Sequence, residues 1–450
     1  MAKKAALHNL GCKVNAYETE AMQEMLEKAG YEIMPFKEGA DVYVINTCTV
    51  TNIADRKSRQ MLHRARKMNP DAIVVAAGCY VQAQDGKEQD PCIDIVLGNN
   101  HKKDLIRILD EYAEKREAKK NAGAQADICG QDSGAYPVAA EIEDIGSTRE
   151  YESLHLTKPG DHTRAYIKVQ DGCNQFCTYC IIPYARGRVR SRALDDVIRE
   201  VQGLASNGYK EVVLTGIHLS SYGIDFDRER HLLELIRAVH EVDGIERIRL
   251  GSLEPGIITE DFARELSGIP EICPHFHLSL QSGCDATLRR MNRRYTSAEY
   301  AEKCRILRKY FDDPALTTDV IVGFPGETEE EFKASYDFVD SIGFYETHIF
   351  KYSRRSGTKA AVMEDQVSEQ VKTERSARMI ALGEQKRAAY EKRYAGREVE
   401  VLIEEQEAIN GRTVQVGHTK EYIKIALENR ENLKNHIVKV LIENGLQIIH

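Results

Sequence analysis

Short apolar runs alternate with amphipathic stretches over the first 115 residues. Runs of apolar residues predict strands at 5–10, 42–46, 73–77 and 93–97. Apolar positions spaced three or four residues apart predict helices at 19–29, 54–68 and 102–112. Strands that alternate with helices form parallel sheets with helices on their faces. The pattern therefore predicts an α/β fold that begins with a small doubly wound N-terminal domain at 1–115.

The same alternation continues between residues 159 and 385. Predicted strands lie at 165–169, 211–215, 247–250, 275–280, 316–322 and 345–350. Predicted helices lie between them at 193–206, 232–242, 259–266, 297–310 and 329–342. Parallel strands joined by right-handed crossovers curl toward a barrel, whose functional groups lie at the carboxyl ends of the strands. We expect a partial (βα)6 barrel over this range.

The last part of the chain has a different pattern. A long polar helix is predicted at 368–394, followed by short alternating strands at 399–403, 413–417 and 437–442. These strands predict a small antiparallel β-barrel within 386–450. Residues 116–158 are polar, become acidic in their second half, and are interpreted as a linker between the first two domains.

Composition narrows the class of protein. The chain carries a net charge of −9, which argues against a general nucleic-acid coat. Mean hydropathy is −0.46, no apolar run is long enough for a membrane helix, and the first residues lack the apolar core of a signal peptide. Its 11 cysteines are too sparse for a disulfide scaffold. We expect a cytoplasmic protein without membrane contact.

The most specific motif is CxxxCxxC, formed by Cys173, Cys177 and Cys180. A partial zinc site or a buried group of small side chains would be the alternatives, but residues 181–192 offer neither Cys nor His as a fourth zinc ligand. Three thiolates on a [4Fe–4S] cluster leave one iron open. That iron can bind S-adenosylmethionine (SAM), which an electron from the cluster then cleaves. The motif predicts radical chemistry.

Three further cysteines follow the first three predicted strands: Cys12, Cys48 and Cys79. Residues that follow successive parallel strands lie along one edge of the sheet, so these sulfurs can converge. Cysteines are also common as small buried residues at strand ends, and that alternative stays open. A second cluster with three thiolate ligands is the hypothesis.

Polar or glycine-rich groups follow the predicted barrel strands. The candidates for SAM contacts are Tyr179, Thr215, Gly216, Ser279 and Gln281. Each has an ordinary structural alternative, such as a turn glycine or a packed tyrosine.

Basic residues after the CxxxCxxC motif are candidates for RNA contact. Arg186, Arg188, Arg190 and Arg192 alternate with small or apolar residues, so in an extended loop they would project to one side and bind phosphates. A solvated loop with local salt bridges is the alternative. A second basic set follows Cys48 on a predicted helix: Arg56, Lys57, Arg59, Arg64, Arg66 and Lys67.

Longer motifs make the chain resemble the radical-SAM methylthiotransferase family over nearly its whole length. The N-terminal part has NLGCKVNAYE, VINTCTVTNIADRKSRQ and AAGCY, and the later part has CNQFCTYCIIPYARGRVRSR, LTGIHLSSYG, LSLQSGC and TDVIVGFPGETEEEF. The resemblance implies an auxiliary [4Fe–4S] cluster on Cys12, Cys48 and Cys79 and a SAM-binding [4Fe–4S] cluster on Cys173, Cys177 and Cys180. It also implies a C-terminal TRAM-type RNA-binding domain.

Within that family, GCKVN and NTCTVT look most like the branch that modifies N6-threonylcarbamoyladenosine next to the anticodon, at tRNA position 37. The resemblance implies that C2 of this adenine receives a methylthio group and that two SAM molecules are used per product. The implied partners are tRNA, an electron donor such as flavodoxin or ferredoxin, and sulfide or the iron–sulfur assembly machinery. Candidates for gripping the modified base are Lys13, Asn15 and Glu254.

Other functions stay open at this point. The same chemistry acts on isopentenyladenosine in tRNA, or on a ribosomal-protein aspartate, in other branches of the family. A protein of another class, a non-catalytic iron–sulfur protein that binds RNA or senses redox state, would also need cluster cysteines, but it would not cleave SAM.

Overall fold

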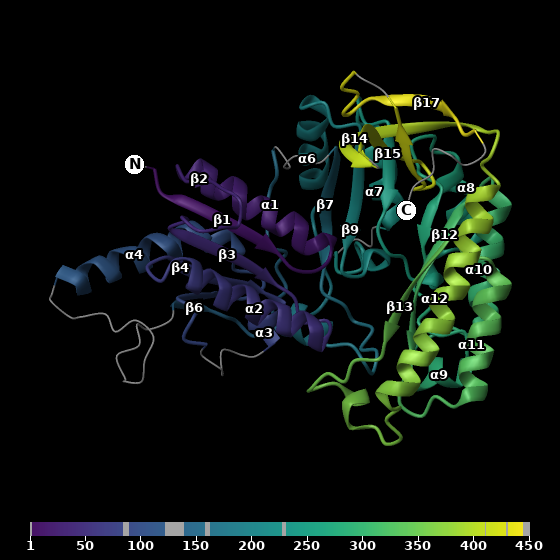
Figure 1. The fold of residues 1–450 in the computed structure, drawn as a ribbon, viewed down its shortest axis with the longest axis horizontal. Helices are drawn as coiled ribbons and strands as arrows, with labels where there is room; N and C mark the ends of the chain where they lie inside the picture. Colours follow the sequence, from purple (N-terminus) through teal and green to yellow (C-terminus); the bar gives the residue numbers. More distant parts are fainter. Residues whose placement is uncertain are drawn as a thin grey trace.

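The computed structural model describes residues 2–83, 90–121, 139–157, 163–226, 231–409, 411–428 and 431–443. Figure 1 shows the N-terminal sheet and its helices in the left part of the molecule. A strongly curved sheet, covered by long helices, forms the right part, and a C-terminal antiparallel sheet lies over one end of it. The expected α/β class is confirmed.

The N-terminal unit is a parallel sheet in the order β2-β1-β3-β4-β5-β6. Its strands are β1 (Lys4–Asn9), β2 (Glu32–Ile33), β3 (Val42–Thr47), β4 (Ile73–Gly78), β5 (Ile95–Leu97) and β6 (Ala139–Glu141). Apolar side chains of α1 (Lys13–Lys28) and α4 (Leu105–Asn121) pack on one face. Those of α2 (Asn52–Met68) and α3 (Cys79–Ala83) pack on the other. This is the predicted doubly wound arrangement, and it directs the ends of β1, β3 and β4 to one edge.

The curved sheet is the predicted partial barrel. Its parallel strands are β7 (Arg164–Asp171), β9 (Glu211–Gly216), β10 (Arg247–Leu250), β11 (His275–His277), β12 (Ala315–Val322) and β13 (Glu346–Lys351). Isolated bridges from Ile248 to Ile272 and from Leu253 to Leu278 join the β10 and β11 edges, so the two halves form one curved layer. The short β8 (Arg190–Ser191) pairs antiparallel with β7, which the sequence pattern did not predict.

Helices cover the convex face of the barrel, with apolar side chains from both layers forming one large core. They are α6 (Leu194–Ser206), α7 (Leu232–His240), α8 (Glu260–Ser267), α10 (Ser297–Tyr310) and α11 (Glu329–Ile342). Two short helices, α5 (Ile182–Arg186) and α9 (Asp285–Arg290), lie in the loops at the carboxyl ends of the strands.

The C-terminal sheet is antiparallel, in the order β16-β15-β14-β17. It follows α12 (Glu369–Lys392) and consists of β14 (Glu398–Ile409), β15 (Arg412–Thr419), β16 (Lys424–Leu427) and β17 (Ile437–Leu441). Two buried barrel arginines join it to the barrel: Arg247 donates to the carbonyls of Glu400 and His418, and Arg249 to that of Lys420.

The segment interpreted as a linker contains ordered structure. Helix α4 continues to Asn121, and β6 adds a strand to the N-terminal sheet. Leu154 and Leu156 are buried against Tyr17 of α1. The sequence pattern did not predict these contacts, because the segment is polar on average and its few apolar residues are scattered. Residues 122–138 and 158 of the predicted linker lie outside the described residues. No helix in the described part of the chain is long and apolar enough to cross a membrane.

Candidate functional site

Cys12, Cys48 and Cys79 are called the N-terminal triad. Cys48 and Cys79 follow β3 and β4 directly, and Cys12 lies three residues after the end of β1. Glycines at positive φ precede two of them, with φ +132° at Gly11 and +95° at Gly78. A Cβ atom on Gly11 would lie 3.1 Å from the Cβ of Cys48, and one on Gly78 would lie 2.5 Å from the Oδ1 of Asn46. The glycines therefore let the chain turn sharply and bring the cysteines together.

Burial and mutual proximity both act on these thiols. Burial raises the pKa of Cys48 to about 11, and the charges of Cys79 and Cys12 add to that shift. Cys12 is exposed to solvent, yet the surrounding protein restricts its hydration enough to raise the pKa of its thiol. The charge of Cys79 acts on both other thiols, so the three cysteines of the N-terminal triad lie close enough to interact electrostatically. Buried thiols with a raised pKa lose their protons when they bind a metal.

Cys173, Cys177 and Cys180, the loop triad, occupy the loop after β7. The turn into the loop needs Gly172, which has a φ of +70° and whose Cβ would lie 1.8 Å from the carbonyl oxygen of Arg188. Burial raises the pKa of Cys173 to about 11 and that of Cys180 to about 12. Nη1 of the buried Arg293 donates to Sγ of Cys177 at 3.3 Å, so a cation already faces this sulfur.

The spacing of the two triads fits clusters better than single ions. Among the described residues, only two groups of three ligands have donor atoms within 4.8 Å of one another, and neither contains a cysteine of either triad. A mononuclear zinc site needs such close spacing, whereas a cubane separates its three thiolates. The soft sulfur donors and their wider spacing fit a [4Fe–4S] cluster at each triad.

Arg186 connects the two triads. It ends α5, six residues after Cys180, is fully buried, and donates from Nε to Sγ of Cys79 at 3.1 Å. Its guanidinium group also donates to both carboxylate oxygens of Glu18 on α1, at 2.5 Å and 3.1 Å. The loop that carries the loop triad thus holds a cysteine of the N-terminal triad.

The predicted row of phosphate-binding arginines does not form. Arg186, Arg190 and Arg192 are buried, and only Arg188 is exposed. Arg192 pairs with Glu200, and Arg190 lies 3.7 Å from Asp171. The prediction was wrong for the three buried arginines because their partners are acids on other elements.

Two of the three candidates for contact with the modified base form hydrogen bonds to other protein groups. The amide of Asn15 donates to the carbonyls of Leu10 and Thr47 and accepts from Arg186, so it supports the N-terminal triad. Glu254 accepts from Nη2 of Arg293 at 2.7 Å. Although burial opposes ionisation, His218 and Arg293 lower the pKa of Glu254.

Lys13 is different, because no described residue holds its ammonium group by a hydrogen bond or an ion pair. Its side chain is exposed next to Cys12. Partial burial, followed by the charges of Arg249 and Arg164, lowers the pKa of Lys13 to about 8. It is the candidate that stays available for a ligand.

The predicted SAM contacts lie at strand ends of the barrel. Gly216 ends β9, and a Cβ there would lie 2.8 Å from Oε1 of Gln170. Gln281 has a φ of +67°, which is unusual for a side chain of its size. The rings of Tyr179 and Phe324 meet edge to face, so Tyr179 packs at the mouth of the barrel. Thr215 is buried at the end of β9.

Sequence reasoning missed Arg293, although it links several parts of this mouth. Besides Cys177 and Glu254, it contacts the carbonyl oxygen of Ser279 at 3.4 Å. Tyr295 also donates to that carbonyl, at 2.7 Å. The adjacent arginines of the segment MNRRYT were the available signal, but they resemble an ordinary charged loop.

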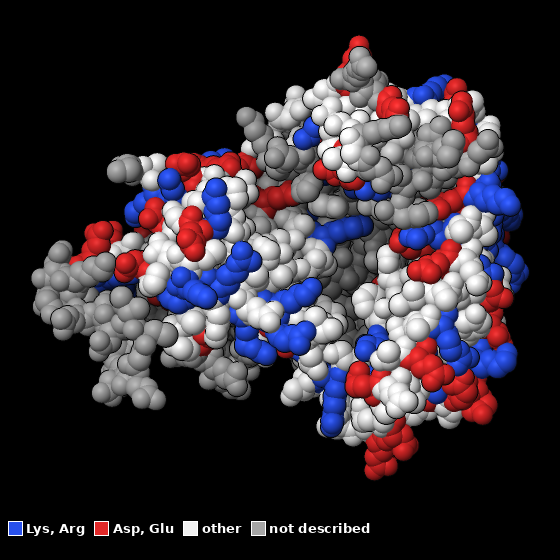
Figure 2. Space-filling view, in the orientation of Figure 1, with Lys and Arg blue, Asp and Glu red and all other residues white. Residues whose placement is uncertain are grey.

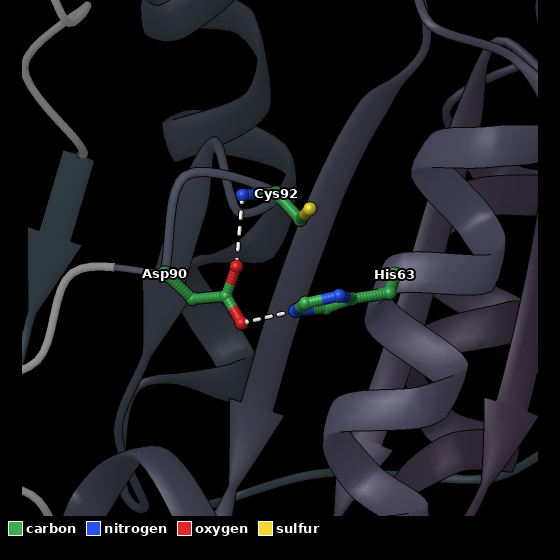
Figure 3. Close-up of side chains that lie close together, drawn as sticks. All are labelled: His63, Asp90 and Cys92. Atoms are coloured by element: carbon green, nitrogen blue, oxygen red, sulfur yellow. Dashed lines mark hydrogen bonds and ion pairs between the residues drawn. The ribbon is translucent and has the colours of Figure 1, made fainter. Parts of the chain in front are cut away.

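The two groups with close donor atoms are separate from the triads. In Figure 3, the ring of His63 on α2 points toward the side chain of Asp90, and the backbone nitrogen of Cys92 faces the same carboxylate. The Asp90 carboxylate contacts Nε2 of His63 at 2.7 Å and accepts from the backbone N–H of Cys92 at 2.9 Å, so it ties α2 to the loop before β5. The second group, His277, Asp319 and His348, lies on the adjacent strands β11, β12 and β13.

Comparison with known proteins agrees with this geometry. Residues 167–339 match the model of the Radical SAM superfamily, and residues 4–98 match that of the Uncharacterized protein family UPF0004. The chain is 42% identical over 439 residues to the threonylcarbamoyladenosine tRNA methylthiotransferase MtaB of Bacillus subtilis (strain 168), covering 97% of this chain and 93% of that protein. This chain belongs to the radical-SAM methylthiotransferase family. The resemblance noted from its motifs is confirmed.

A second relative and a solved structure extend the comparison. The methylthiotransferase chain is 33% identical to a tRNA-2-methylthio-N(6)-dimethylallyladenosine synthase of Alkaliphilus oremlandii (strain OhILAs), over 98% of this chain and 90% of that protein. The radical S-adenosylmethionine methyltransferase TsrM from Kitasatospora setae has a similar fold, with a TM-score of 0.55 and 19% identity over 80% of this chain and 77% of that chain. As a radical-SAM methylthiotransferase, the protein is an enzyme that uses [4Fe–4S] clusters and SAM.

Proposed function

We propose that this enzyme attaches a methylthio group to C2 of N6-threonylcarbamoyladenosine at position 37 of tRNA. The observation that carries the proposal is the pair of cysteine triads linked by Arg186, within a chain most of whose length aligns at 42% identity with a threonylcarbamoyladenosine methylthiotransferase. Identity to the dimethylallyladenosine enzyme is lower, at 33%. A non-catalytic iron–sulfur protein is not favoured by these relatives.

In the proposal, the N-terminal triad holds the auxiliary cluster and the loop triad holds the SAM-binding cluster. When bound, the clusters supply the electron that cleaves SAM and the sulfur that is transferred. The protein's own part is to keep the ligands in place: Arg186 donates to Cys79, and Arg293 donates to Cys177. Thr215, Gly216, Ser279, Gln281 and Tyr179 remain predicted SAM contacts.

Lys13 suits the proposed base. The threonyl group of N6-threonylcarbamoyladenosine ends in a carboxylate, whereas a dimethylallyl group is apolar. An exposed ammonium group beside Cys12, with no competing partner in the described structure, can bind that carboxylate where the sulfur is delivered. Asn15 and Glu254 hold other residues and are not proposed as base contacts.

We further propose that the C-terminal sheet is a TRAM-type RNA-binding unit and that the enzyme works in the cytoplasm. An electron donor such as flavodoxin or ferredoxin would reduce the SAM-binding cluster. Sulfide or the iron–sulfur assembly machinery would restore the auxiliary cluster.

The test is anaerobic turnover. The protein is reconstituted with iron and sulfide, then given reductant, SAM and tRNA from cells that lack its gene, and the nucleosides are analysed by mass spectrometry. The 2-methylthio form of threonylcarbamoyladenosine is expected. Formation of 2-methylthio-isopentenyladenosine instead would move the enzyme to the other tRNA branch, and neither product despite SAM cleavage would indicate a protein substrate. Lys13→Met should raise KM for the modified tRNA, while Lys13→Arg should largely preserve it.

A further inference from the structure

Helix α2 carries a one-sided row of positive charge. Its exposed cations include Arg56, Lys57, Arg64 and Lys67, and the only acid within Asn52–Met68 is Asp55. Asp55 is neutralised by Arg355, so it does not offset the row. Figure 2 shows basic side chains gathered over the part of the surface where Figure 1 places α2.

Helical geometry places these cations on one face. At 3.6 residues per turn, Arg56, Lys57, Arg64 and Lys67 fall within about 100° of one another around the helix axis. The buried residues Ser58, Leu62 and Ala65 lie on the opposite side. From Arg56 to Lys67 the row extends for about 16 Å along the helix axis. We call this surface the α2 stripe.

The four cations of the α2 stripe have no ion-pair partner in the part of the chain that the structure describes. Among the described residues, none of them forms an ion pair or a side-chain hydrogen bond. Arg66, at the edge of the helix, pairs with Asp94 and is not part of the stripe. In a protein with a net charge of −9, uncompensated cations on a single face indicate a local site for an anionic partner.

The stripe starts at the N-terminal triad. Ser58 of α2 contacts the backbone of Cys48, donating to its carbonyl at 3.1 Å. The exposed apolar side chains of Val50 and Ile53 lie between that cysteine and the first cations, with exposed fractions of 50% and 57%. At this end Asn52 donates to the carbonyl of Arg354, which is itself exposed.

We propose that the α2 stripe binds the phosphate backbone of the RNA substrate and leads it to the N-terminal triad. This inference rests on the proposed function for the identity of the RNA. A linear row of cations suits a polynucleotide backbone, whose charges are also in a line, and apolar side chains at its end suit contact with unstacked bases. An acidic electron-donor protein would instead need to approach the loop triad, whereas this surface leads to Cys48.

The experiment compares the reconstituted holoenzyme with its Arg64→Gln/Lys67→Gln variant. These two residues lie at the end of the stripe away from Cys48, and neither forms a side-chain hydrogen bond or an ion pair with a described residue. The control is Lys303→Gln/Arg305→Gln, two cations of α10, a helix that Figure 1 shows on the opposite side of the molecule. Affinity for full-length tRNA is measured by fluorescence anisotropy at several salt concentrations.

Each lost phosphate contact reduces the slope of log affinity against log salt by about 0.7 to 0.9. The double variant should therefore bind tRNA more weakly and lose about 1.4 to 1.8 from the slope. Its iron content and tRNA-independent SAM cleavage should match those of the parent and the control. An unchanged slope, or an equal change in the control, would overturn the proposal.

Two further outcomes are informative. If the variant keeps its tRNA affinity but is reduced more slowly by an acidic flavodoxin, the stripe belongs to the electron donor and the RNA proposal is overturned. Binding is measured with tRNA that carries threonylcarbamoyladenosine and with tRNA that lacks it. Because a backbone contact is independent of the modified base, the slope change is expected with both, even if the base assigned above were wrong.

Discussion

Glu18 is the carboxylate at the centre of a buried ion network, and its removal gives the sharpest test of how the two units are joined. It lies on α1 in the N-terminal unit and contacts Lys168 of the barrel at 2.8 Å and Lys102 at 3.2 Å, in addition to Arg186. All four side chains are fully buried. Although burial opposes ionisation, Arg186, Lys102 and Lys168 hold the pKa of Glu18 well below its ordinary value.

The expected cost follows from the charges left behind. Glu18→Gln keeps the size of the side chain and one oxygen acceptor, so packing changes little. Lys168 and Arg186 retain Asp171 as a partner, at 2.6 Å and 3.2 Å. Among the described residues, Lys102 would retain only Glu152, at 4.0 Å, as an ion-pair partner. Breaking a buried ion pair by removing one member costs about 3–5 kcal/mol. We expect a loss of that size in the free energy of unfolding.

The assay is urea unfolding of the metal-free protein, followed by circular dichroism and analysed at the first cooperative transition, because several units need not unfold together. The matched control is Glu27→Gln, an exposed carboxylate on the same helix, which should change the free energy by less than about 0.5 kcal/mol. A loss below about 1 kcal/mol for Glu18→Gln would refute the reasoning, because it would mean that water or rearranged side chains compensate the stranded cations.

Three other predictions concern the triads and the network. Arg293→Gln should reduce the iron bound at the loop triad, since Cys177 loses its donor; iron analysis of the reconstituted variant checks this. Gly172→Ala should prevent correct folding of the loop, with little soluble protein recovered, whereas Gly203→Ala in α6, which has open space, should raise thermal stability slightly. Because the pKa values of Glu18 and Asp171 are lowered in the fold, their stabilisation is complete above the ordinary carboxyl values of 4.5 and 3.8 and is lost as pH falls below them. Melting temperature measured against pH should therefore fall less steeply on the acid side in Glu18→Gln.

The sequence predicted the strands and helices well wherever each element buries one face. The predicted helices at 297–310 and 329–342 match α10 and α11, which lie against the barrel and expose their other side. The helix predicted at 19–29 begins earlier, at Lys13. Its first turns bury polar residues, including Asn15 and Glu18, so an apolar periodicity could not reveal them.

The candidate site was predicted from spacing, but its supporting residues were not. Cysteines at strand ends can be found from a sequence because the apolar runs that form the strands can be recognised in it. Arg186 was predicted to contact RNA, yet its partner Glu18 is 168 residues away. A buried ion pair of this kind has no signature in the local sequence, since arginines are equally common in solvated loops. Such residues can be assigned only when the fold brings both partners together.

The composition of the network explains why these charges are buried at all. Lys102, Lys168, Arg186 and Arg190 face the three acids Glu18, Asp171 and Glu152, so the cations exceed the anions by one. Burying an unpaired cation is expensive. Arg186, however, also donates to Sγ of Cys79. Although burial opposes its charge, Cys79, Glu18 and Asp171 together raise the pKa of Arg186 well above its ordinary value. The contact from Arg186 to Cys79 therefore gives this group of cations a partner besides the three acids, and it joins the buried network to the N-terminal triad.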